Sequence, residues 1–585
     1  MCGIAGLITK SGQDPDRAVL ERMARALAHR GPDGQAVTIA AGVGLVHTRL
    51  AIVDLQTGAQ PLTADDGTSL IANAEIYNDL AIRAELGSAA YATGSDCESA
   101  LHMYRRHGAT FADKLRGMYA IAIHDPRQDR VVLARDPFGI KPVYYAETEQ
   151  AFCFASEPQA LIAGGLVVPK VNTKARDEVL GLQFTTGAET IFSGIQRVMP
   201  GETLVIARGR VVERCVVDAL PDASAAAESE LASLKTFDEA WFDSINVHRR
   251  ADVPYGMFLS GGIDSSAVLA MMARQDRRAV LAYTAAFPGT DAHDEREQAR
   301  IVARALGAEH IEIEVTAKDF WQHLPRIAAA MDDPAADYAV IPSYLLASRA
   351  KHEVKVVLTG EGGDELFAGY GRYRGALRPW PFTKTPRRRS PFDGLGVLSS
   401  HAHWRAGLDE IEHHASHKDY DKLQALQAAD MAAWLPNDLL IKLDRCLMAH
   451  GLEGRVPFLD SAVARIAFPL APKLKIRKGL GKWLLRRWLA DAAPSASPYA
   501  RKRGFSVPVG DWMAQDNARL GPLLARHPAL AEICDPRAVE ALFADPGAKH
   551  AEARWRLLFY TLWHNRHILG HDVSGGILDV LSANS

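Results

Sequence analysis

The sequence has no run of about 18 unbroken apolar residues, the length that a membrane-spanning helix requires. The amino terminus also lacks the basic and then apolar layout of a secretory signal peptide. Charge of neither sign is in large excess, since the formal net charge is −3 at pH 7. These absences predict a protein with no membrane segment and without the basic surface on which nucleic-acid binding depends.

Cysteine is scarce, because the 585 residues contain only six, and these are widely scattered. No pair has Cys-x-x-Cys spacing, and no cluster of cysteine and histidine has the spacing of a zinc site. This pattern predicts a reducing, cytoplasmic location, with most thiols serving as small buried apolar groups. Internal repeats are absent, and a chain of this length predicts two domains.

The first 200 residues have the pattern of short strands separated by turns. Apolar and β-branched runs predict strands within residues 42–54, 69–79, 118–125, 130–136 and 142–147. Apolar spacing predicts two helices, at 16–30 and at 95–108, the second with Ser95 or Asp96 as its N-cap. Strand runs with few helices indicate a layered α+β domain.

The pattern changes after residues 219–232, a small and polar segment that is predicted to be a linker or a loose helix. Strands and helices alternate in the part that follows, which predicts a parallel sheet covered by helices on both faces. The predicted strands lie in 253–259, 279–287, 310–315 and 354–360, with helices at 267–275 and 294–307. The last third has a mainly helical pattern.

The segment Ser-Gly-Gly-Ile-Asp-Ser-Ser at 260–266 follows a predicted strand and opens a predicted helix. Its glycines allow the backbone to approach a bound group, and the helix N-terminus supplies free N–H groups and a positive dipole. Taken alone, such a segment is more often a plain turn into a helix. The segment has no Walker lysine, and Asp264 favours a magnesium–pyrophosphate site over a kinase site.

A second glycine-rich loop, at 358–370, also begins where a predicted apolar strand ends, and it carries Glu361, Asp364 and Glu365. Ligands bind at the carboxyl ends of strands in a parallel sheet, so both loops are expected to face one crevice. An acidic surface turn is the alternative, but the strand–glycine–acid pattern occurs twice. We therefore predict carboxylates that hold Mg²⁺ or position a nucleophile.

Cys2 directly follows the initiator methionine. Removal of Met1 would leave Cys2 with a free α-amino group, whose usual pKa of about 7.7–8 suits a base near neutral pH. Nucleophile and base would then belong to one residue, and no histidine would be needed. A cysteine at this position is more often incidental, so the interpretation depends on the surrounding motifs.

Two ordered sets of motifs carry a resemblance that covers nearly the whole chain. MCGIAG, HRGPDG, RLAIVD, NAEIYN, GSDCE and RDPFGIKPVYY resemble the glutaminase domain of class II glutamine amidotransferases. SGGIDSS, TGEGGDE, LEGRVPFLD, GKWLLR and KRGFSVPVGDW resemble the synthetase domain of the asparagine synthetase B family. The resemblance implies an α+β N-terminal-nucleophile sandwich (αββα) at 2–212. It implies an α/β ATP-pyrophosphatase domain at 233–570, with a parallel sheet and a helical C-terminal part.

The resemblance implies roles in the first domain. Cys2 would attack the amide carbon of glutamine and hold the glutamyl thioester. Arg49 would bind the α-carboxylate of glutamine and Asp96 its α-ammonium. Asn73 and the backbone N–H of Ala74 would form the oxyanion hole. The implied glutamine-binding set is Arg49, Leu50, Ile52, Val53, Asn73, Ala74, Glu75 and Asp96.

In the second domain, the resemblance implies that ATP activates a carboxylate, aspartate by default, as an acyl-AMP with release of pyrophosphate. Ammonia from glutamine would then attack the adenylate. Glu361 and Lys482 would serve in forming and breaking that adenylate, and Asp264 and Asp364 would ligate Mg²⁺. The implied ATP-binding set is Leu259, Ser260, Gly261, Gly262, Asp264, Ser265, Ser266, Ala285, Thr359 and Gly360. Such enzymes are commonly dimers, so a homodimer is one expected assembly.

The chain departs from the family at position 74, where Ala replaces the usual Gly. If that position needs a positive φ, the alanine is strained by roughly 1 kcal/mol and the glutaminase is slower; otherwise the alanine fits. Residues 331–344 lie where the family recognises its acceptor carboxylate, and the Arg/Pro-rich segment 378–391 could border a larger anionic acceptor.

Three functions are weighed. The first is an amidating ligase that makes asparagine, with a sugar acid, a peptide or a secondary metabolite as alternative acceptors. The second is an amidotransferase that feeds ammonia to a sugar-phosphate domain, which SGGIDSS disfavours. The third is a non-catalytic scaffold, against which the presence of Cys2, Asp264, Glu361 and Lys482 argues.

Overall fold

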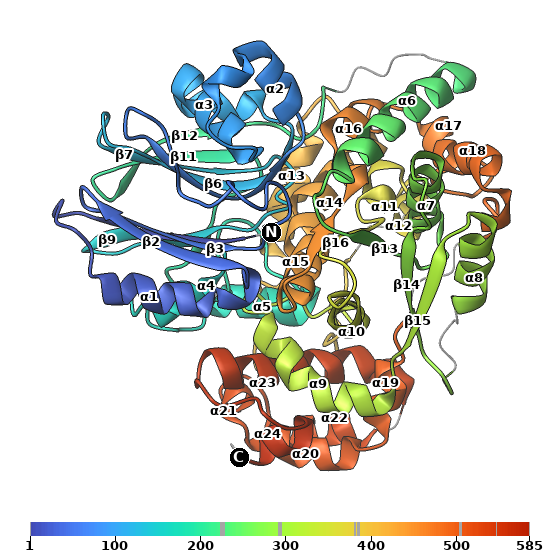
Figure 1. Ribbon diagram of the computed structural model, residues 1–585. Helices are drawn as coiled ribbons and strands as arrows, with labels where there is room; N and C mark the ends of the chain where they lie inside the picture. Colours follow the sequence, from blue (N-terminus) through green and yellow to red (C-terminus); the bar gives the residue numbers. More distant parts are fainter. Residues whose placement is uncertain are drawn as a thin grey trace.

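The computed structural model describes residues 2–222, 229–290, 295–379, 382, 387–501, 506–545 and 547–583. Two sheet-containing parts lie side by side, and a bundle of helices lies below them in the view of Figure 1. Within the described ranges, no helix has both the length and the apolar character that crossing a membrane requires. All six cysteines are unpaired.

The first part contains two antiparallel sheets of six strands each. In spatial order, the first sheet consists of β10 (Gln196–Arg197), β8 (Tyr144–Glu147), β9 (Ala151–Ala155), β1 (Gly3–Thr9), β3 (Val43–Arg49) and β2 (Gly34–Ala40). The second consists of β12 (Arg210–Val216), β11 (Glu202–Ala207), β7 (Arg130–Arg135), β6 (Gly117–Asp125), β5 (Ser69–Ile76) and β4 (Leu62–Thr63).

The two sheets pack face to face through a shared core. Ile4 and Leu45 of the first sheet and Ile71 and Ala120 of the second are buried in one cluster. Helices cover both outer faces (Figure 1) and complete the αββα sandwich that the sequence predicted. They are α1 (Arg17–Ala26) and α4 (Pro158–Ala163) on one side, and α2 (Asp79–Leu86) and α3 (Cys97–His107) on the other.

The five predicted strand runs coincide with β3, β5, β6, β7 and β8, with β6 beginning one residue earlier than predicted, and the two predicted helices contain α1 and α3. Asp16 caps α1, because its carboxylate accepts a hydrogen bond from the N–H of Ala18. Asp96 occupies the N-cap position of α3 but makes no capping bond. Its carboxylate accepts a hydrogen bond from Ile76 N–H instead, at 2.6 Å, so the predicted N-cap residue is confirmed for Asp96 but its side chain does not cap the helix.

The second part is built on a sheet of five parallel strands. Successive strands first add on one side of β13 and then on the other, so the order reverses between β13 and β16. Ligands of open parallel sheets bind at such a switch point, beyond the carboxyl ends of the strands. The spatial order is β15 (Glu309–Glu314), β14 (Leu281–Ala286), β13 (Tyr255–Phe258), β16 (Val356–Leu358) and β17 (Glu453–Arg455).

Helices flank this sheet and confirm the expected α/β architecture. α8 and α10 both pack on β14 and β15, and α6, α7 and α18 pack on one another. Their bounds are α6 (Glu230–His248), α7 (Ile263–Gln275), α8 (Arg296–Ala305), α10 (Val340–Ala350) and α18 (Trp483–Ala492). α6 begins at the end of the predicted linker, where Ser229 caps it, and residues 223–228 of that linker lie outside the described residues.

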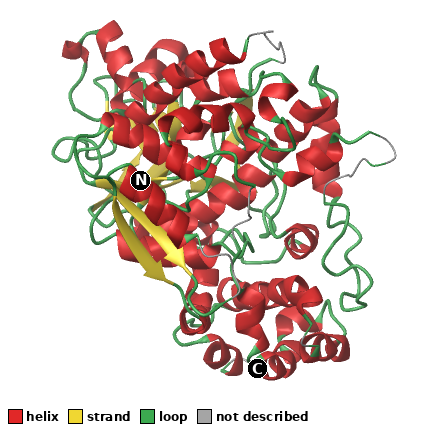
Figure 2. Cartoon of the chain, turned by 90° about the vertical axis from the view of Figure 1, so that its right-hand side faces the viewer, coloured by secondary structure: helices red, strands yellow, loops and turns green. Residues whose placement is uncertain are grey.

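The last third adds a bundle that is built almost wholly of helices (Figure 2). The bundle contains α9 (Ala317–Ala330), α19 (Val509–Ala514), α20 (Asn517–Arg526), α21 (Pro528–Ala531), α22 (Pro536–Ala544), α23 (Ala551–His567) and α24 (Ile577–Ser582). Between the sheet and the bundle lie α11 (Gly363–Leu366), α12 (Gly371–Ala376), α13 (Ala406–Ser416), α14 (Lys422–Ala432), α15 (Leu440–Met448), α16 (Ser461–Ala467) and α17 (Pro472–Lys475).

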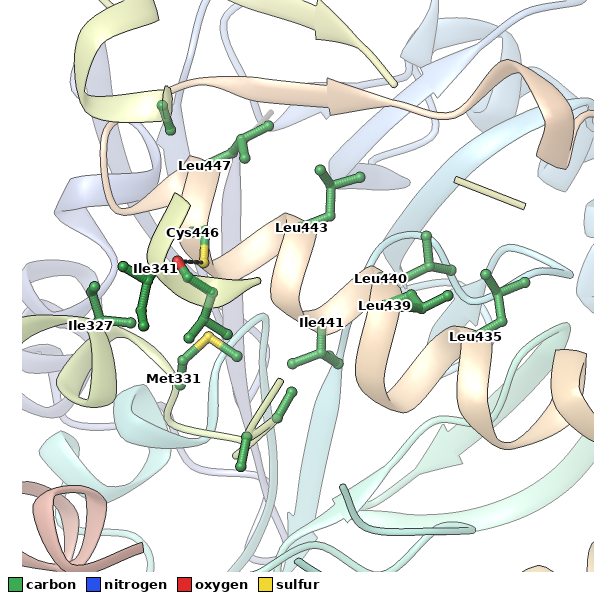
Figure 3. Close-up of a cluster of buried hydrophobic side chains, with 14 of the residues drawn as sticks. Ile327, Met331, Ile341, Leu435, Leu439, Leu440, Ile441, Leu443, Cys446 and Leu447 are labelled. Atoms are coloured by element: carbon green, nitrogen blue, oxygen red, sulfur yellow. Dashed lines mark hydrogen bonds between the residues drawn. The ribbon is translucent and has the colours of Figure 1, made fainter. Parts of the chain in front are cut away.

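Helix α15 is held from inside by apolar packing. Figure 3 shows Leu443, Cys446 and Leu447 of α15 in a buried cluster with Ile341 of α10 and Met331. The Cys446 thiol also donates to the backbone carbonyl of Val340, at 3.4 Å. α15 therefore has a fixed orientation, which matters because its other face carries charged residues.

The two parts meet through buried ion pairs. Arg30 of the first part binds both carboxylate oxygens of Asp444 on α15, at 2.8 and 2.9 Å, and also Glu157 at 2.7 Å. Asp333 accepts hydrogen bonds from Arg197 at 2.6 and 2.8 Å and from Tyr144 at 2.7 Å. Asp332 is also buried, and it accepts a hydrogen bond from Arg445 at 2.7 Å. Both acids belong to the segment expected to recognise the acceptor, and both are thus already paired with arginines.

Two candidate active sites

Cys2 directly precedes β1 in the middle of the first sheet. Its backbone N donates to Asn73 Oδ1 at 3.0 Å, and its carbonyl accepts a hydrogen bond from Arg30 Nε at 3.3 Å. The Cys2 sulfur lies 4.0 Å from the carbonyl oxygen of Leu50. The residue that carries the predicted nucleophile is thus fixed against the residue that carries the predicted oxyanion-hole amide.

The edge of β5 next to Cys2 offers hydrogen-bond donors. Ala72 N–H bonds the side chain of Gln60 and Ile76 N–H bonds that of Asp96, so both N–H groups point to the open edge of the strand. Strand alternation places the N–H of Ala74 on the same edge, between them. Asn73 Nδ2 is buried and has no hydrogen-bond partner among the described residues. These two donors are what an oxyanion hole requires.

Ala74 is an ordinary strand residue, paired opposite Tyr119 in β6. It is not among the described residues that have a positive φ. An alanine therefore fits this position without backbone strain, and the expectation of a slower glutaminase loses its physical reason.

Burial shapes the titration of this site. Burial raises the pKa of the Cys2 thiol, so the thiol needs a base to become a nucleophile near neutral pH. Burial also raises the pKa of Glu75 to about 8 and that of Asp96 to about 6. A bound ammonium would favour the charged forms of both carboxylates, so both side chains suit an α-ammonium site.

The other predicted glutamine-binding residues lie at the end of β3 and on the loop that follows it. The guanidinium of Arg49 donates to the carbonyl of Asp54 at 2.5 Å and to that of Leu55 at 3.5 Å. Leu50 and Ile52 are buried and Val53 is half-buried. The loop therefore holds the guanidinium at its edge, where a carboxylate could approach it.

The phosphate-type loop of the second part ends β13 at the switch point of the parallel sheet. Gly261 has a φ of +70°, and a Cβ there would lie 2.9 Å from the backbone N of Ala299. A Cβ on Gly360, in the second loop, would lie 2.9 Å from the Cβ of Asp264. The two glycine-rich loops therefore touch, as the sequence predicted for a shared crevice.

The polar groups of these loops are arranged around the N-terminus of α7. The hydroxyls of Ser260 and Ser265 lie 3.1 Å apart. The hydroxyls of Ser266 and Thr359 are buried, and neither has a partner in the described part of the chain. Leu259, directly after β13, and Ala285, on β14, are buried and apolar. Unpaired hydroxyls beside a helix N-terminus suit phosphate oxygens.

Lys482 brings the two predicted metal-binding carboxylates together. Its ammonium binds Asp264, and it binds Asp364 at 2.7 Å. Burial opposes the charge of Lys482, but the two carboxylates outweigh burial and raise its pKa. Lys482 has a left-handed backbone with φ of 59°, a conformation that is concentrated at functional sites.

The donor set fits Mg²⁺ only in part. Two carboxylates at one point are what Mg²⁺ takes from a protein when phosphate oxygens and water complete its shell. Among the described residues, no group of three or more His, Cys, Asp or Glu could hold a metal by itself. The residues present therefore fit a Mg²⁺ ion that arrives with ATP.

Glu361 lies near one lysine and several other carboxylates. Lys442 Nζ is 4.0 Å from its carboxylate, and the charges of Asp364 and Asp264 also act on it. Burial raises the pKa of Glu361. Of the second-part motifs, GKWLLR opens α18 and LEGRVPFLD contains β17, whereas residues 502–505 of KRGFSVPVGDW lie outside the described residues.

One residue that connects the two sites had no role assigned from the sequence. Arg455 of β17 binds Glu75 at 2.8 Å, and its carbonyl accepts a hydrogen bond from Thr359 N–H at 2.9 Å. The residue belongs to the motif LEGRVPFLD, but only the fold brings it beside β5. Its side chain therefore contacts the predicted glutamine site, while its backbone contacts the predicted nucleotide loop.

Family models match most of the chain: one described as "Asparagine synthase" matches residues 236–565, and one described as "Glutamine amidotransferase domain" matches residues 1–215. "Asparagine synthetase [glutamine-hydrolyzing] 1" of Bacillus subtilis is 32% identical, and the alignment covers 97% of each chain. "Asparagine synthetase B [glutamine-hydrolyzing]" of Escherichia coli is 29% identical over 87% of this chain and 83% of its own.

A glutamine phosphoribosylpyrophosphate amidotransferase of Bacillus subtilis is similar among solved structures, with 19% identity. The likeness covers 53% of this chain and 65% of that one, with a TM-score of 0.29. That score is too low to bear on the fold.

Proposed function

The chain belongs to the asparagine synthase family, and on that premise we propose that it converts aspartate, glutamine and ATP into asparagine, glutamate, AMP and pyrophosphate. Membership of the family makes it an ATP-dependent ligase that hydrolyses glutamine. One observation supports the specific proposal most. A single chain holds Cys2 against Asn73 in one sandwich, and Asp264, Lys482 and Asp364 at the switch point of the next sheet.

The glutaminase half begins with the amino group of Cys2. After loss of Met1, that amine would be held by Asn73 Oδ1, which the Cys2 nitrogen already contacts at 3.0 Å. The amine takes the thiol proton, and the thiolate attacks the amide carbon of glutamine. Asn73 Nδ2 and Ala74 N–H stabilise the oxyanion, and the amine returns its proton to the leaving ammonia. Water then hydrolyses the thioester to glutamate.

The synthetase half takes place at the two glycine-rich loops. The segment 260–266 and the N-terminus of α7 bind the ATP phosphates. The acceptor carboxylate attacks the α-phosphorus, pyrophosphate leaves, and ammonia displaces AMP from the acyl carbon. Lys482 offsets phosphate charge, and Glu361 accepts the proton that the attacking ammonia loses. Asp264 and Asp364 would hold a Mg²⁺ ion, which neutralises pyrophosphate charge when bound.

The interface between the parts suits ammonia transfer. Free ammonia is mostly ammonium at neutral pH, so a route that excludes water keeps it a nucleophile.

The unpaired cysteines support a reducing compartment, the cytoplasm, for the reaction. A different carboxylate acceptor with the same chemistry is the second candidate, because the acceptor segment places Asp332 and Asp333 in the domain interface. The domain limits 2–212 and 233–570 and the homodimer remain predictions.

The test is product analysis with ¹⁵N-amide glutamine, ATP, Mg²⁺ and aspartate, followed by mass spectrometry. We expect labelled asparagine to form in step with AMP and pyrophosphate. A Cys2→Ala variant should lose glutamine-dependent synthesis and keep synthesis from ammonium chloride. Glutamate without AMP or asparagine would contradict the aspartate assignment and direct the search to other carboxylates.

A further inference from the structure

A cluster of polar side chains lies next to Glu361. Lys442, on α15, binds Asp337 at 3.0 Å and lies 4.0 Å from Glu361. Burial disfavours the charged form of Asp337, but the nearby Lys442 outweighs burial and lowers the pKa of Asp337. An acceptor whose carboxylate reaches the α-phosphate beside Glu361 would extend toward these two residues.

The cluster continues into the π-helical turn η4 (Leu435–Leu439), which precedes α15. Asp438 of this turn is 0% exposed, and its Oδ1 has no hydrogen-bond partner among the described residues. Asn437 Nδ2 is likewise buried and unpaired within the ranges that the structure describes. Burial, together with the carboxylate of Asp337, raises the pKa of Asp438 to about 7. Single π-helical turns occur frequently at functional sites.

One member of the cluster comes from the glutaminase part. Gln183 ends α5 (Thr173–Leu182) in a left-handed conformation, with φ of 78°. Its Nε2 donates to Asp438 Oδ2 at 2.8 Å, and its Oε1 accepts from Arg556 at 3.3 Å. Its carbonyl oxygen accepts from Ala336 N–H at 2.7 Å, next to Asp337. The first part thus inserts one amide side chain among the charged groups of the second.

A second cation lies near the same turn. Arg387, from the Arg/Pro-rich segment, stacks on Trp434 with its guanidinium carbon 3.9 Å from the ring centre. It binds Asp430 through Nη1 at 3.3 Å, and its Nη2 is buried with no partner in the described chain. Arg387 and Asp438 are close enough to shift each other's pKa. The cluster therefore offers unpaired donors and an unpaired carboxylate oxygen together.

We propose that Gln183, Asp438 and Lys442 form the far wall of the acceptor pocket and determine its specificity, by binding the α-carboxylate and the α-ammonium of the acceptor. Unpaired buried donors require a ligand with oxygen acceptors, and an unpaired buried carboxylate oxygen requires a ligand with a donor. A zwitterionic amino acid satisfies both. A polyanionic acceptor would leave the acids unsatisfied.

The wall also limits the size of the acceptor. The hydrogen bond between Gln183 and Asp438 closes the end of the cluster. Behind it, Phe184 packs edge-on against Trp434, with ring centres 5.4 Å apart. Gln183 is therefore a specificity-determining residue that the glutaminase part contributes to the reaction of the other part. This inference rests on the proposed synthetase function.

The test distinguishes an effect on binding of the acceptor from effects on binding of ATP or glutamine. Pyrophosphate release is measured with ammonium chloride as nitrogen source, so the glutaminase is bypassed, and glutamine hydrolysis is measured separately. For Gln183→Leu, we expect the KM for aspartate to rise at least tenfold, while the KM for ATP and glutamine hydrolysis stay within twofold. Asp438→Asn keeps the shape of the wall and should raise the same KM.

Lys355→Ala is the matched control. It removes another contact between the two parts, the Lys355–Asp33 ion pair at 2.8 Å, and should change no KM. An aspartate KM unchanged in both Gln183→Leu and Asp438→Asn would overturn the inference, even with an active wild type. A wild type that amidates only carboxylates without an α-amino group would overturn the inference and the aspartate assignment together. Activity of the wild type on aspartate thus tests the proposed function. The ratio of the aspartate KM of each variant to that of the wild type tests the proposed wall.

Discussion

Asp96 shows at the scale of one residue what the glutamine site requires. Its carboxylate is buried, accepts a hydrogen bond from Ile76 N–H and has a pKa raised to about 6. A raised folded-state pKa means that the stability associated with the protonated form is present at low pH and lost as the pH rises through about 6. Near neutral pH, the protein therefore keeps a charge that reduces its stability, in the position where an ammonium would bind.

Asp96→Asn should stabilise the protein and inactivate its glutaminase. Removing the buried charge is expected to raise the free energy of unfolding by roughly 1–3 kcal/mol at pH 8, since each pKa unit corresponds to about 1.4 kcal/mol. The gain should shrink at pH 5, where the folded wild type is mostly protonated. Thermal unfolding at both pH values measures this difference. An equal change in Tm at pH 5 and pH 8 would contradict the linkage, and glutamine hydrolysis should fall at least 100-fold.

Strand β17 (Glu453–Arg455) is the element that joins the two sites. Arg455 reaches Glu75 of β5 with its side chain, and its carbonyl accepts from Thr359 in the nucleotide loop. It also donates to the carbonyls of His248 and Arg250, at 2.9 and 2.7 Å, so its guanidinium is firmly placed. The proposed glutamine site is therefore in contact with an element of the other part.

Arg455→Met should raise the KM for glutamine at least tenfold and leave the KM for ATP unchanged in the ammonia-dependent reaction. Arg455 lowers the pKa of Glu75, which is about 8, so its loss should weaken glutamine binding most above pH 8, where only the wild type would carry the Glu75 charge. Breaking one partner of a buried pair costs about 3–5 kcal/mol. Steady-state kinetics and Tm report both effects. The double variant Arg455→Met, Glu75→Gln should recover stability but not glutamine affinity, and no recovery would argue against a direct pairing.

The sequence predicted those elements whose pattern is local. The alternating run at 69–79 predicted β5, and the apolar run before the glycines predicted β13. It could not predict β17, because three residues carry no periodicity and their pairing with β16 is decided by packing far along the chain. Motifs were enough to predict Cys2 and Lys482 as site residues. The positions of Gln183, Arg455 and Asp438 depend on packing between distant parts of the chain, so the sequence did not predict their roles.

At the scale of the molecule, the two parts are joined by charge as well as by apolar contact. Arg30 and Asp444 are both buried and make two parallel hydrogen bonds, and Arg116 binds Asp460 at 2.9 Å. Bidentate pairs fix orientation as well as distance. The parts therefore have one relative position, which suits the transfer of a reactive product between them.

Arg30→Met should loosen that arrangement. Asp444 would keep its bond from Arg445 Nη1, at 2.6 Å, but would lose both bonds from Arg30, and breaking that buried pair is expected to cost about 3–5 kcal/mol at the interface. The ratio of glutamate to asparagine formed should rise, as ammonia escapes before it is used. Amino-acid analysis of both products measures that ratio. The exposed-pair variant Lys355→Ala should leave the ratio unchanged, and an unchanged ratio in both would show that the contact has no part in coupling.

The late position of β17 has a consequence for protein synthesis. The strands of the sandwich all lie before residue 217, so the glutaminase part can fold early on the ribosome. Arg455 emerges only after most of the chain has been made, and until then Glu75 has no guanidinium beside it. On the proposed function, a nascent chain would lack the Arg455–Glu75 contact of the glutamine pocket until the sheet that uses ammonia is complete. The order of translation would then place ammonia production after the means of using it.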